Sequence, residues 1–320
     1  DGVVVGEGWH TRYGEAHAEV EALRSAGERA RGATLFVTLE PCTHHGRTPP
    51  CSEAILAAGV RRVVVAVSDP NPVAAGGAAR LREAGLEVTV GLGEESAREL
   101  NASFFHALTS DRPFVRLKLA LSLDGALTDH TRVPGWLTGV DARAEVHRLR
   151  AGADAVAVGI GTVLADDPLL TVRGFPAPRV TPIRIVFDTS ARLPVGSRLA
   201  QTANETPVMV VCWAPDPAHA LALEQAGVEL LHAATLSDAL RALRARGVRS
   251  LLVEGGASLA ASLMQEALVD RLVIFHAPLV LGRGALHPFG ALAAATIDEA
   301  PRWRVTRSAR GRNPPGAGTA

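Results

Sequence analysis

The sequence predicts an α/β protein of two domains, on three observations. Short apolar runs, such as "TLFVTLE" at 34–40 and "RRVVVAVSD" at 61–69, alternate with segments that have helical spacing. Such alternation is typical of βαβ units, whose parallel sheet is covered by helices. With 320 residues the chain is long enough for two cores, and the Pro after a polar run in "SDRPF" at 110–114 marks the joint between them.

The first domain opens with a predicted strand at 3–6. A helix at 18–30 follows, in which Val20, Leu23 and Ala26 or Ala30 share one face. The later elements of this domain are predicted from β-branched runs, helical spacing and Gly ends. They are strands at 34–40, 61–69 and 87–91 and helices at 52–59, 77–85 and 95–110.

The second domain repeats the same alternation. We predict strands at 114–121, 154–158, 183–187, 207–212, 250–254 and 271–277 and helices at 141–150, 217–226, 236–245 and 257–267. The expected domains are therefore residues 1–111 and 112–309. The Pro- and Gly-rich end at 310–320 is predicted to be a disordered tail.

Composition excludes several classes of protein. Hydrophobic residues make up 47% of the chain, too many for a disordered protein, yet no apolar run reaches the roughly 18 residues of a membrane span. Lys+Arg and Asp+Glu balance at 33 each, so no electrostatic attraction to nucleic acid is expected. Three cysteines are too few for a disulfide framework. Because disulfides are rare in the reducing cytoplasm, we expect the protein to be cytoplasmic.

His17, Cys42 and Cys51 are the predicted metal ligands. His17 starts a predicted helix that also carries Glu19, Cys42 follows a strand through Pro41, and Cys51 opens the next helix. These places meet at the carboxyl edge of a parallel sheet, and helix N-termini favour thiolates. Cysteine and histidine are the ligands that zinc prefers, and three of them leave a fourth position for water.

Two other interpretations of these residues stay open. The cysteines could be small buried apolar residues, with His17 on the surface. A structural zinc site could instead take His44 or His45 as a fourth ligand, which would leave Glu19 without a task. Otherwise both of these histidines line the mouth of a pocket or lie in a solvated loop, and Arg47 in the same stretch contacts substrate or remains a surface arginine.

The order H-x-E, P-C and a second Cys is typical of zinc-dependent nucleobase deaminases, although eight residues separate the cysteines here. Over roughly residues 1–285 the chain resembles the bifunctional riboflavin-biosynthesis deaminase/reductase family. The matching motifs are "HAEV", "EPCTHHGRTPPC", "DPNP", "LKLALSLDG", "GTVLADDPLLTVR", "VEGGASLAASL" and "APLVLG". The resemblance implies a cytidine-deaminase-like three-layer domain followed by a dihydrofolate-reductase-like α/β domain, in a homo-oligomer, either a dimer or a tetramer.

The resemblance also implies two reactions. The first is zinc-dependent hydrolytic deamination of 2,5-diamino-6-ribosylamino-4(3H)-pyrimidinone 5′-phosphate, with Glu19 as the general acid/base. The second is reduction of the ribosyl side chain to ribityl by NADPH. The only expected partner is this small phosphorylated pyrimidine, with neither nucleic acid nor membrane.

Taken alone, the Gly pair in "VEGG" is weak evidence of a phosphate site, and the loop "GTVLADDPLLTVR" is weak evidence of a ligand-binding loop. The resemblance assigns them, position by position, to a reductase site. The expected substrate contacts are Arg150, Arg173 and Glu254. The expected NADPH contacts are Ala120, Trp136, Thr162, Asp166, Gly256, Ala257, Ser258, Leu259, Ala260, Ala261 and Ser262.

Lys118 is the only lysine among 33 basic residues. Strand alternation puts it on the face opposite Leu117 and Leu119, at a sheet edge where it could simply be solvated. Arg does not replace a compact ammonium, and the family has Lys at this position near the hydride-transfer site. We therefore expect Lys118 to be catalytic.

The chain departs from the family in three places. The family has an earlier helix and strand with a P-N-P segment, so we expect a deaminase sheet with an exposed edge. Pro134 stands where the family has Ser, and the final strand is not recognisable after "RWRVTRSARG". The alternatives are a truncated chain with reductase activity only, a nucleoside-type or tRNA deaminase with a non-catalytic second domain, and a non-enzymatic relative kept for assembly.

Overall fold

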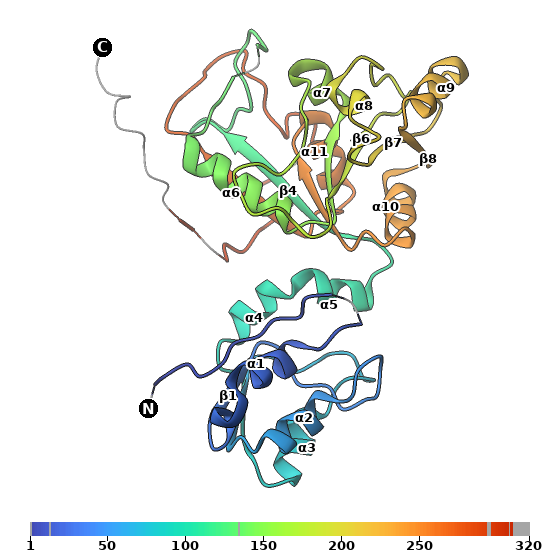
Figure 1. Cartoon of the computed structure of the whole chain (residues 1–320). Helices are drawn as coiled ribbons and strands as arrows, with labels where there is room; N and C mark the ends of the chain where they lie inside the picture. Colours follow the sequence, from blue (N-terminus) through green and yellow to red (C-terminus); the bar gives the residue numbers. More distant parts are fainter. Residues whose placement is uncertain (1, 13, 134, 293–295, 307, 310–320) are drawn as a thin grey trace. The chain divides into compact units, whose positions relative to one another are not determined.

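The computed structural model describes the chain except for residues 1, 13, 134, 293–295, 307 and 310–320 (Figure 1). The predicted tail at 310–320 and Pro134 therefore lie outside the described residues. The chain forms two compact units, Asp1–Thr109 and Ser110–Ala320. In the part that the structure describes, no helix combines the length and apolar character needed to cross a membrane.

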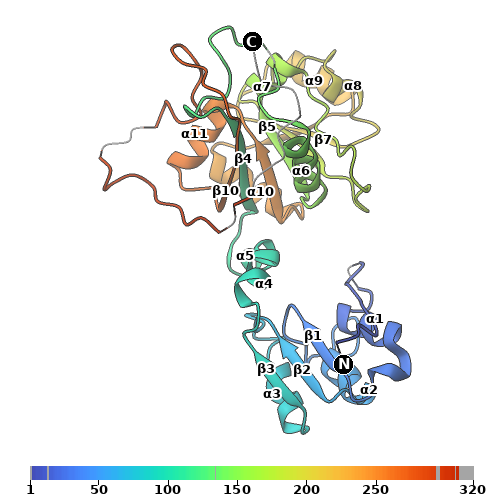
Figure 2. The ribbon, with the colours of Figure 1, turned by 90° about the vertical axis from the view of Figure 1, so that its left-hand side faces the viewer.

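The first unit holds a three-stranded parallel sheet in the order β1-β2-β3 (Figure 2). Its strands are β1 Thr34–Val37, β2 Arg62–Val65 and β3 Glu87–Val90, and its helices are α1 Ala18–Ala26, η1 Gly27–Ala30, α2 Cys51–Ala58, α3 Gly77–Glu83, α4 Glu94–Leu100 and α5 Ala102–Thr109. Ile55, Val63 and Leu81 are fully buried between the helices and the sheet. Removal of such side chains from water is the main stabilising contribution to this small core.

Two predicted helices of this unit are shorter than expected. The helix predicted at 18–30 ends at Ala26, because Gly27 takes a positive φ of 57° and a 3-10 turn follows. The helix predicted at 95–110 is divided into α4 and α5 at Asn101, whose side-chain amide donates to the carbonyl of Ala97 at 2.9 Å. Side chains that bond to the backbone in this way compete with helix continuation.

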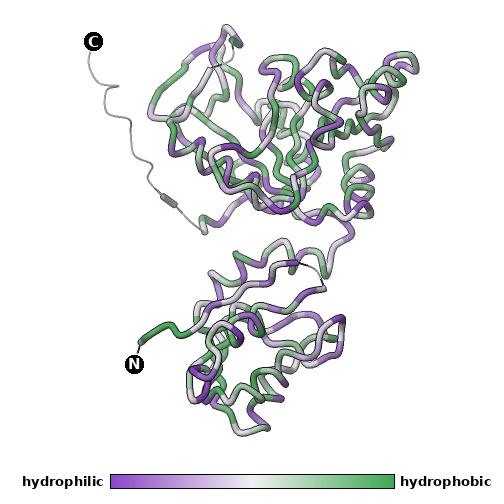
Figure 3. Tube along the Cα trace, in the orientation of Figure 1, coloured by the Kyte–Doolittle hydropathy of each residue, from purple (hydrophilic) through white to green (hydrophobic). Residues whose placement is uncertain are grey.

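The strand predicted at 3–6 is absent among the described residues, because this segment packs against α1 rather than beside a strand. A Cβ on Gly6 would lie 2.6 Å from the carbonyl oxygen of Ala22, so only glycine permits this approach. The Val5 carbonyl accepts a hydrogen bond from Arg29 at 2.9 Å. The segment is hydrophobic (Figure 3), and Val3 remains 74% exposed.

The second unit contains seven parallel strands in the order β10-β4-β9-β5-β6-β7-β8. The strands are β4 Phe114–Leu121, β5 Ala155–Gly159, β6 Ile183–Phe187, β7 Val208–Cys212, β8 Glu229–His232, β9 Ser250–Glu254 and β10 Arg271–His276. The helices are α6 Val140–Ala151, α7 Ile160–Asp166, α8 Arg198–Gln201, α9 Pro217–Gln225, α10 Leu236–Ala245 and α11 Ala257–Gln265.

Each face of this sheet has its own core. Leu240 of α10 and Leu263 of α11 pack with Leu117 of β4 on one face. Leu149 of α6 and Val163 of α7 pack with strand residues on the other face. Burial on both faces explains why the strands are nearly continuous hydrophobic runs.

Three elements of this unit were not predicted: α7, α8 and β8. The segment 161–173, predicted as a loop, begins inside α7. The expectation that Lys118 lies at a sheet edge is also wrong, because β4 lies between β10 and β9. Parallel pairing brings together strands that are distant in the chain, and sequence periodicity does not contain this information.

Candidate metal centre and reductase site

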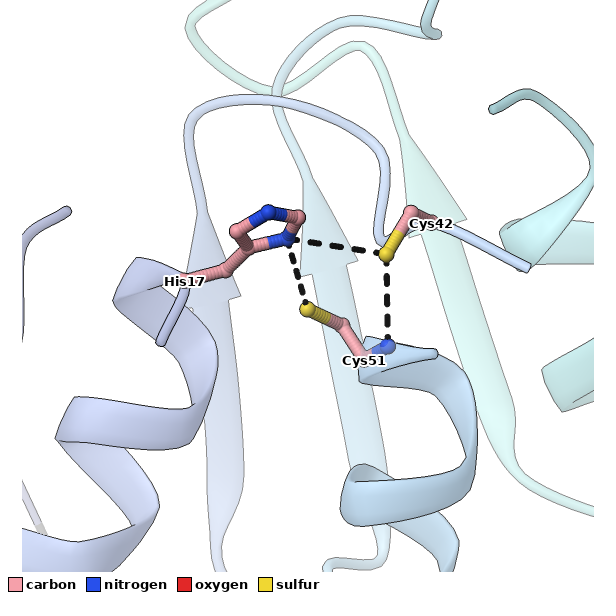
Figure 4. Close-up of side chains that lie close together, drawn as sticks. All are labelled: His17, Cys42 and Cys51. Atoms are coloured by element: carbon pink, nitrogen blue, oxygen red, sulfur yellow. Dashed lines mark hydrogen bonds between the residues drawn. The ribbon is translucent and has the colours of Figure 1, made fainter. Parts of the chain in front are cut away.

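The first unit brings His17, Cys42 and Cys51 together (Figure 4). His17 directly precedes α1, Cys42 follows β1 through a short loop, and Cys51 is the first residue of α2. The Nδ1 atom of His17 lies 3.2 Å from the Sγ of Cys51 and 3.6 Å from the Sγ of Cys42. The three predicted ligands therefore face a common point at the carboxyl edge of the sheet.

This donor set fits zinc. One imidazole nitrogen and two sulfurs lie within 4.8 Å of one another, and such mixed N/S sets are typical of zinc sites. Neither His44 nor His45 belongs to this cluster in the described part of the chain. The geometry therefore offers three protein donors, which is the arrangement of a catalytic rather than a structural zinc site.

The electrostatics of the cluster favour a bound cation. A hydrogen bond with Cys51 lowers the pKa of the Cys42 thiol to about 5, while the same hydrogen bond raises the pKa of Cys51. Burial raises the pKa of Glu19, and hydrogen bonds, including one with the Cys51 thiol, act in the opposite direction. A metal cation is the group that would stabilise both sulfurs as thiolates at once.

The loop that carries Cys42 is held by residues that the sequence did not reveal. The buried carboxylate of Glu40 accepts hydrogen bonds from the backbone N–H of Asp69 at 3.0 Å and of Ala78 at 2.9 Å. A Cβ on Gly77 would lie only 1.8 Å from the carbonyl oxygen of Pro41, so this position excludes any side chain. These contacts tie the turn at Pro41–Cys42 (the P-C turn) to the start of α3 and to the segment "DPNP" at 69–72.

In the second unit Lys118, Glu254 and Arg150 form one charged group. Strand pairing places Lys118 of β4 directly beside Glu254 of β9. Glu254 forms a bidentate ion pair with Arg150 of α6, at 2.5 and 2.8 Å. Burial lowers the pKa of Lys118, and the Glu254 carboxylate opposes this shift.

The predicted nucleotide contacts are only partly brought together. Thr162 of α7 lies beside Gly256, whose Cβ would meet the Thr162 hydroxyl at 3.3 Å. Gly255 and Gly256 both have positive φ, of 74° and 85°, directly before α11. The turn that follows β5 therefore lies beside the turn that follows β9, at the carboxyl ends of two adjacent strands where nucleotides bind in open α/β sheets.

The other predicted nucleotide contacts lie in different surroundings. The side chains of Leu259, Ala260 and Ala261 are buried in the core of the second unit. Trp136 is 78% exposed, and the Arg143 guanidinium lies 5.0 Å from its ring centre. The remaining positions are Ala120 on β4, Asp166 at the end of α7, and Ala257, Ser258 and Ser262 on α11.

The comparisons with known proteins agree with this geometry. The cytidine and deoxycytidylate deaminase zinc-binding region matches residues 1–67, and the RibD C-terminal domain matches residues 113–312. Fold and site therefore define a bifunctional enzyme in which a zinc-dependent deaminase unit is joined to a reductase unit. The chain belongs to the RibD family of riboflavin biosynthesis proteins.

Curated relatives and solved structures cover most of the chain. Riboflavin biosynthesis protein RibD of Aquifex aeolicus is 44% identical over 95% of this chain and 85% of its own length. The Escherichia coli protein is 42% identical, over 89% of this chain and 81% of its own. The structure of Acinetobacter baumannii RibD (form 1) has a TM-score of 0.77 at 40% identity, covering 94% of this chain and 84% of its own.

A Thermotoga maritima structure has a TM-score of 0.80 at 35% identity, with 95% of this chain and 84% of its own covered. It is described as a diaminohydroxyphosphoribosylaminopyrimidine deaminase/5-amino-6-(5-phosphoribosylamino)uracil reductase. The chain is therefore similar over both units to proteins that combine the two activities.

Proposed function

We propose that this chain deaminates 2,5-diamino-6-ribosylamino-4(3H)-pyrimidinone 5′-phosphate and then reduces the ribosyl side chain of the product to ribityl with NADPH. The convergence of His17, Cys42 and Cys51 beside Glu19 carries the proposal. The name of the Thermotoga maritima relative supports this choice of substrate. We assign deamination to residues 1–111 and reduction to 112–309.

In the deamination step His17, Cys42 and Cys51 would hold one zinc ion. When bound, zinc lowers the pKa of water to about 7 and so supplies a nucleophile near neutral pH. Glu19 takes the proton of the attacking water and delivers protons to the ring nitrogen and to the departing ammonia. Burial suits Glu19 for this role, because a raised pKa lets a carboxyl group both hold and release a proton.

In the reduction step NADPH would supply a hydride to C1′ of the sugar, while the C1′–O4′ bond breaks and O4′ takes a proton from water, so that the ribose opens to a ribityl chain. Lys118 provides a compact positive charge beside the reacting sugar, and burial makes that charge sensitive to its neighbours. Glu254 forms an ion pair with Arg150 and lies beside Lys118. It therefore holds these two cations in a fixed position relative to each other. The Gly255–Gly256 turn and Thr162 would face the phosphates of the nucleotide.

The test uses the purified full chain loaded with zinc. Ammonia release from the diaminopyrimidinone measures the first step, and loss of NADPH absorbance with the deaminated product measures the second. Release of ammonia from cytidine in place of the diaminopyrimidinone would favour a nucleoside deaminase. NADPH oxidation without any ammonia release would show that the chain has reductase activity only.

A further inference from the structure

The ring of His147 holds the segment that carries Arg173. The backbone N–H of Arg173 donates a hydrogen bond to the Nδ1 of His147 at 3.1 Å. Three residues further along α6, Arg150 donates through Nη1 to the carbonyl of Thr171 at 2.8 Å. Residues three apart on a helix share one face, so α6 grips the segment 171–173 at two adjacent points.

The second of these points is rigidly anchored. The guanidinium of Arg150 pairs bidentately with the carboxylate of Glu254, and the two side chains are only 10% and 9% exposed. Bidentate pairs of this kind fix orientation as well as distance. The segment 171–173 is therefore fastened, through Arg150 and Glu254, to the strand beside Lys118.

The Arg173 side chain itself is exposed, and its guanidinium makes no ion pair in the described part of the chain. A planar guanidinium next to a cluster of charged groups is suited to bind a phosphate through two parallel hydrogen bonds. The backbone bond to His147 thus holds the main chain from which this cation extends.

We propose that His147 is a positioning residue of the reductase: its ring fixes the backbone at Arg173, so that the guanidinium meets the phosphate of the ribosylamino-pyrimidine substrate. This inference rests on the proposed function, because it takes Arg173 as a substrate contact. The role is distinct from catalysis, since His147 acts through Arg173 and not on the reacting carbon.

The surroundings of His147 keep its ring in the form that this role needs. Burial lowers its pKa first, and the cations of Arg150 and Arg173 lower it further. The carboxylate of Glu254 and a hydrogen bond to the Thr171 carbonyl act in the opposite direction. A neutral imidazole has one acceptor nitrogen, and the imidazolium has none, so the Arg173 N–H bond requires the neutral ring.

The test compares two substitutions of His147 in the zinc-loaded full chain. His147→Leu removes the acceptor, and we expect KM for the deaminated substrate to rise about three- to tenfold, the scale of one neutral hydrogen bond, with kcat within about twofold. His147→Asn places a carbonyl oxygen near the position of Nδ1 and should restore KM. Arg148→Leu, which removes an exposed cation from the same helix, is the matched control and should leave KM unchanged.

A double-mutant cycle with Arg173→Ala completes the test. Arg173→Ala should raise KM by about tenfold or more, and adding His147→Leu to it should raise KM no further. An additive effect, failure of His147→Asn to restore KM, or an unchanged KM in His147→Leu would overturn the proposal for His147. An unchanged KM in Arg173→Ala would instead show that Arg173 is not a substrate contact. A reductase kcat within about twofold of the wild-type value in the same samples verifies that the second unit is folded.

Discussion

The backbone N–H of Cys51 donates a hydrogen bond to the Sγ of Cys42 at 3.3 Å (Figure 4). Cys51 is the first residue of α2, so its N–H has no partner within the helix and is free to face this sulfur, while the next N–H, that of Ser52, donates to the Cys42 carbonyl at 3.2 Å. Such N–H groups stabilise a thiolate, and they hold Cys42 in place before any metal arrives. The metal centre is therefore partly preformed by the helix.

The first prediction concerns metal content. We expect about one zinc per chain by elemental analysis, and Cys42→Ser should lower the affinity for zinc strongly, because a hydroxyl is a poor zinc ligand beside a thiolate. Cys212→Ser is the matched control: Cys212 is buried in the core of the second unit and does not belong to the cluster. Full zinc content in Cys42→Ser would contradict the ligand assignment.

The second prediction separates chemistry from metal binding. Glu19→Gln should retain zinc and lose deamination by about 100-fold or more, since the amide no longer takes and releases a proton. Glu53→Gln, an exposed position on α2, should change neither quantity. Loss of zinc along with activity in Glu19→Gln would show that this carboxylate supports the fold of the site instead.

The third prediction follows from the close approach of Gly77 to Pro41. Gly77→Ala should weaken zinc binding, because a Cβ 1.8 Å from the Pro41 carbonyl oxygen must push the P-C turn away. Zinc affinity is measured by competition with a chromophoric chelator, without any activity assay. Gly196→Ala, where the added Cβ meets nothing within 4 Å, is the control. Equal affinity of the Gly77→Ala and wild-type chains would mean that the turn does not depend on this contact.

The fourth prediction concerns the single lysine. Lys118→Arg keeps the charge but replaces a compact donor by a larger planar one. Reductase kcat/KM should fall by at least about tenfold, which corresponds to ~1.4 kcal/mol, while deamination in the other unit is unchanged. Normal NADPH-dependent reduction by this variant would remove the role given to Lys118 and leave the reductase assignment intact.

The fifth prediction is a pH dependence of stability. Burial lowers the pKa of Lys118 in the folded protein, so holding the ammonium there disfavours folding. The destabilisation is fully present below the pKa of Lys118 in the folded protein. It disappears as the pH rises past the pKa of lysine in the unfolded chain, about 10.4. Lys118→Met should therefore raise the urea midpoint at pH 7, and the gain should shrink towards pH 10. A gain that grows with pH would contradict the sign of the shift.

Much of the fold follows from local signals. β4, β6, β9 and α10 have the predicted bounds, because the strands are hydrophobic runs buried in the sheet and α10 has an apolar face with Leu240 and Leu243 at its centre. The α/β class with parallel sheets is confirmed. α8 has only four residues and α7 begins in a Gly-containing turn, so neither gave a periodic signal.

The metal cluster was predictable because each ligand lies in a short motif with its own chemistry. The residues that hold the cluster and the segment 171–173 were not. Glu40 depends on the N–H groups of Asp69 and Ala78, and His147 depends on Arg173, all of them distant in the chain. Such partners become visible only once strands and helices have been brought side by side.

The strand order of the second unit has a consequence for biosynthesis. β4 is the first strand of that sheet to leave the ribosome, but its two neighbours, β9 and β10, are the last two of the described strands. The first unit, with its sheet in the order β1-β2-β3, pairs as it emerges. During translation β4, which carries Lys118, must therefore remain unpaired until β9 and β10 have been synthesised. Its apolar face is exposed during this time, so it can bind chaperones or aggregate.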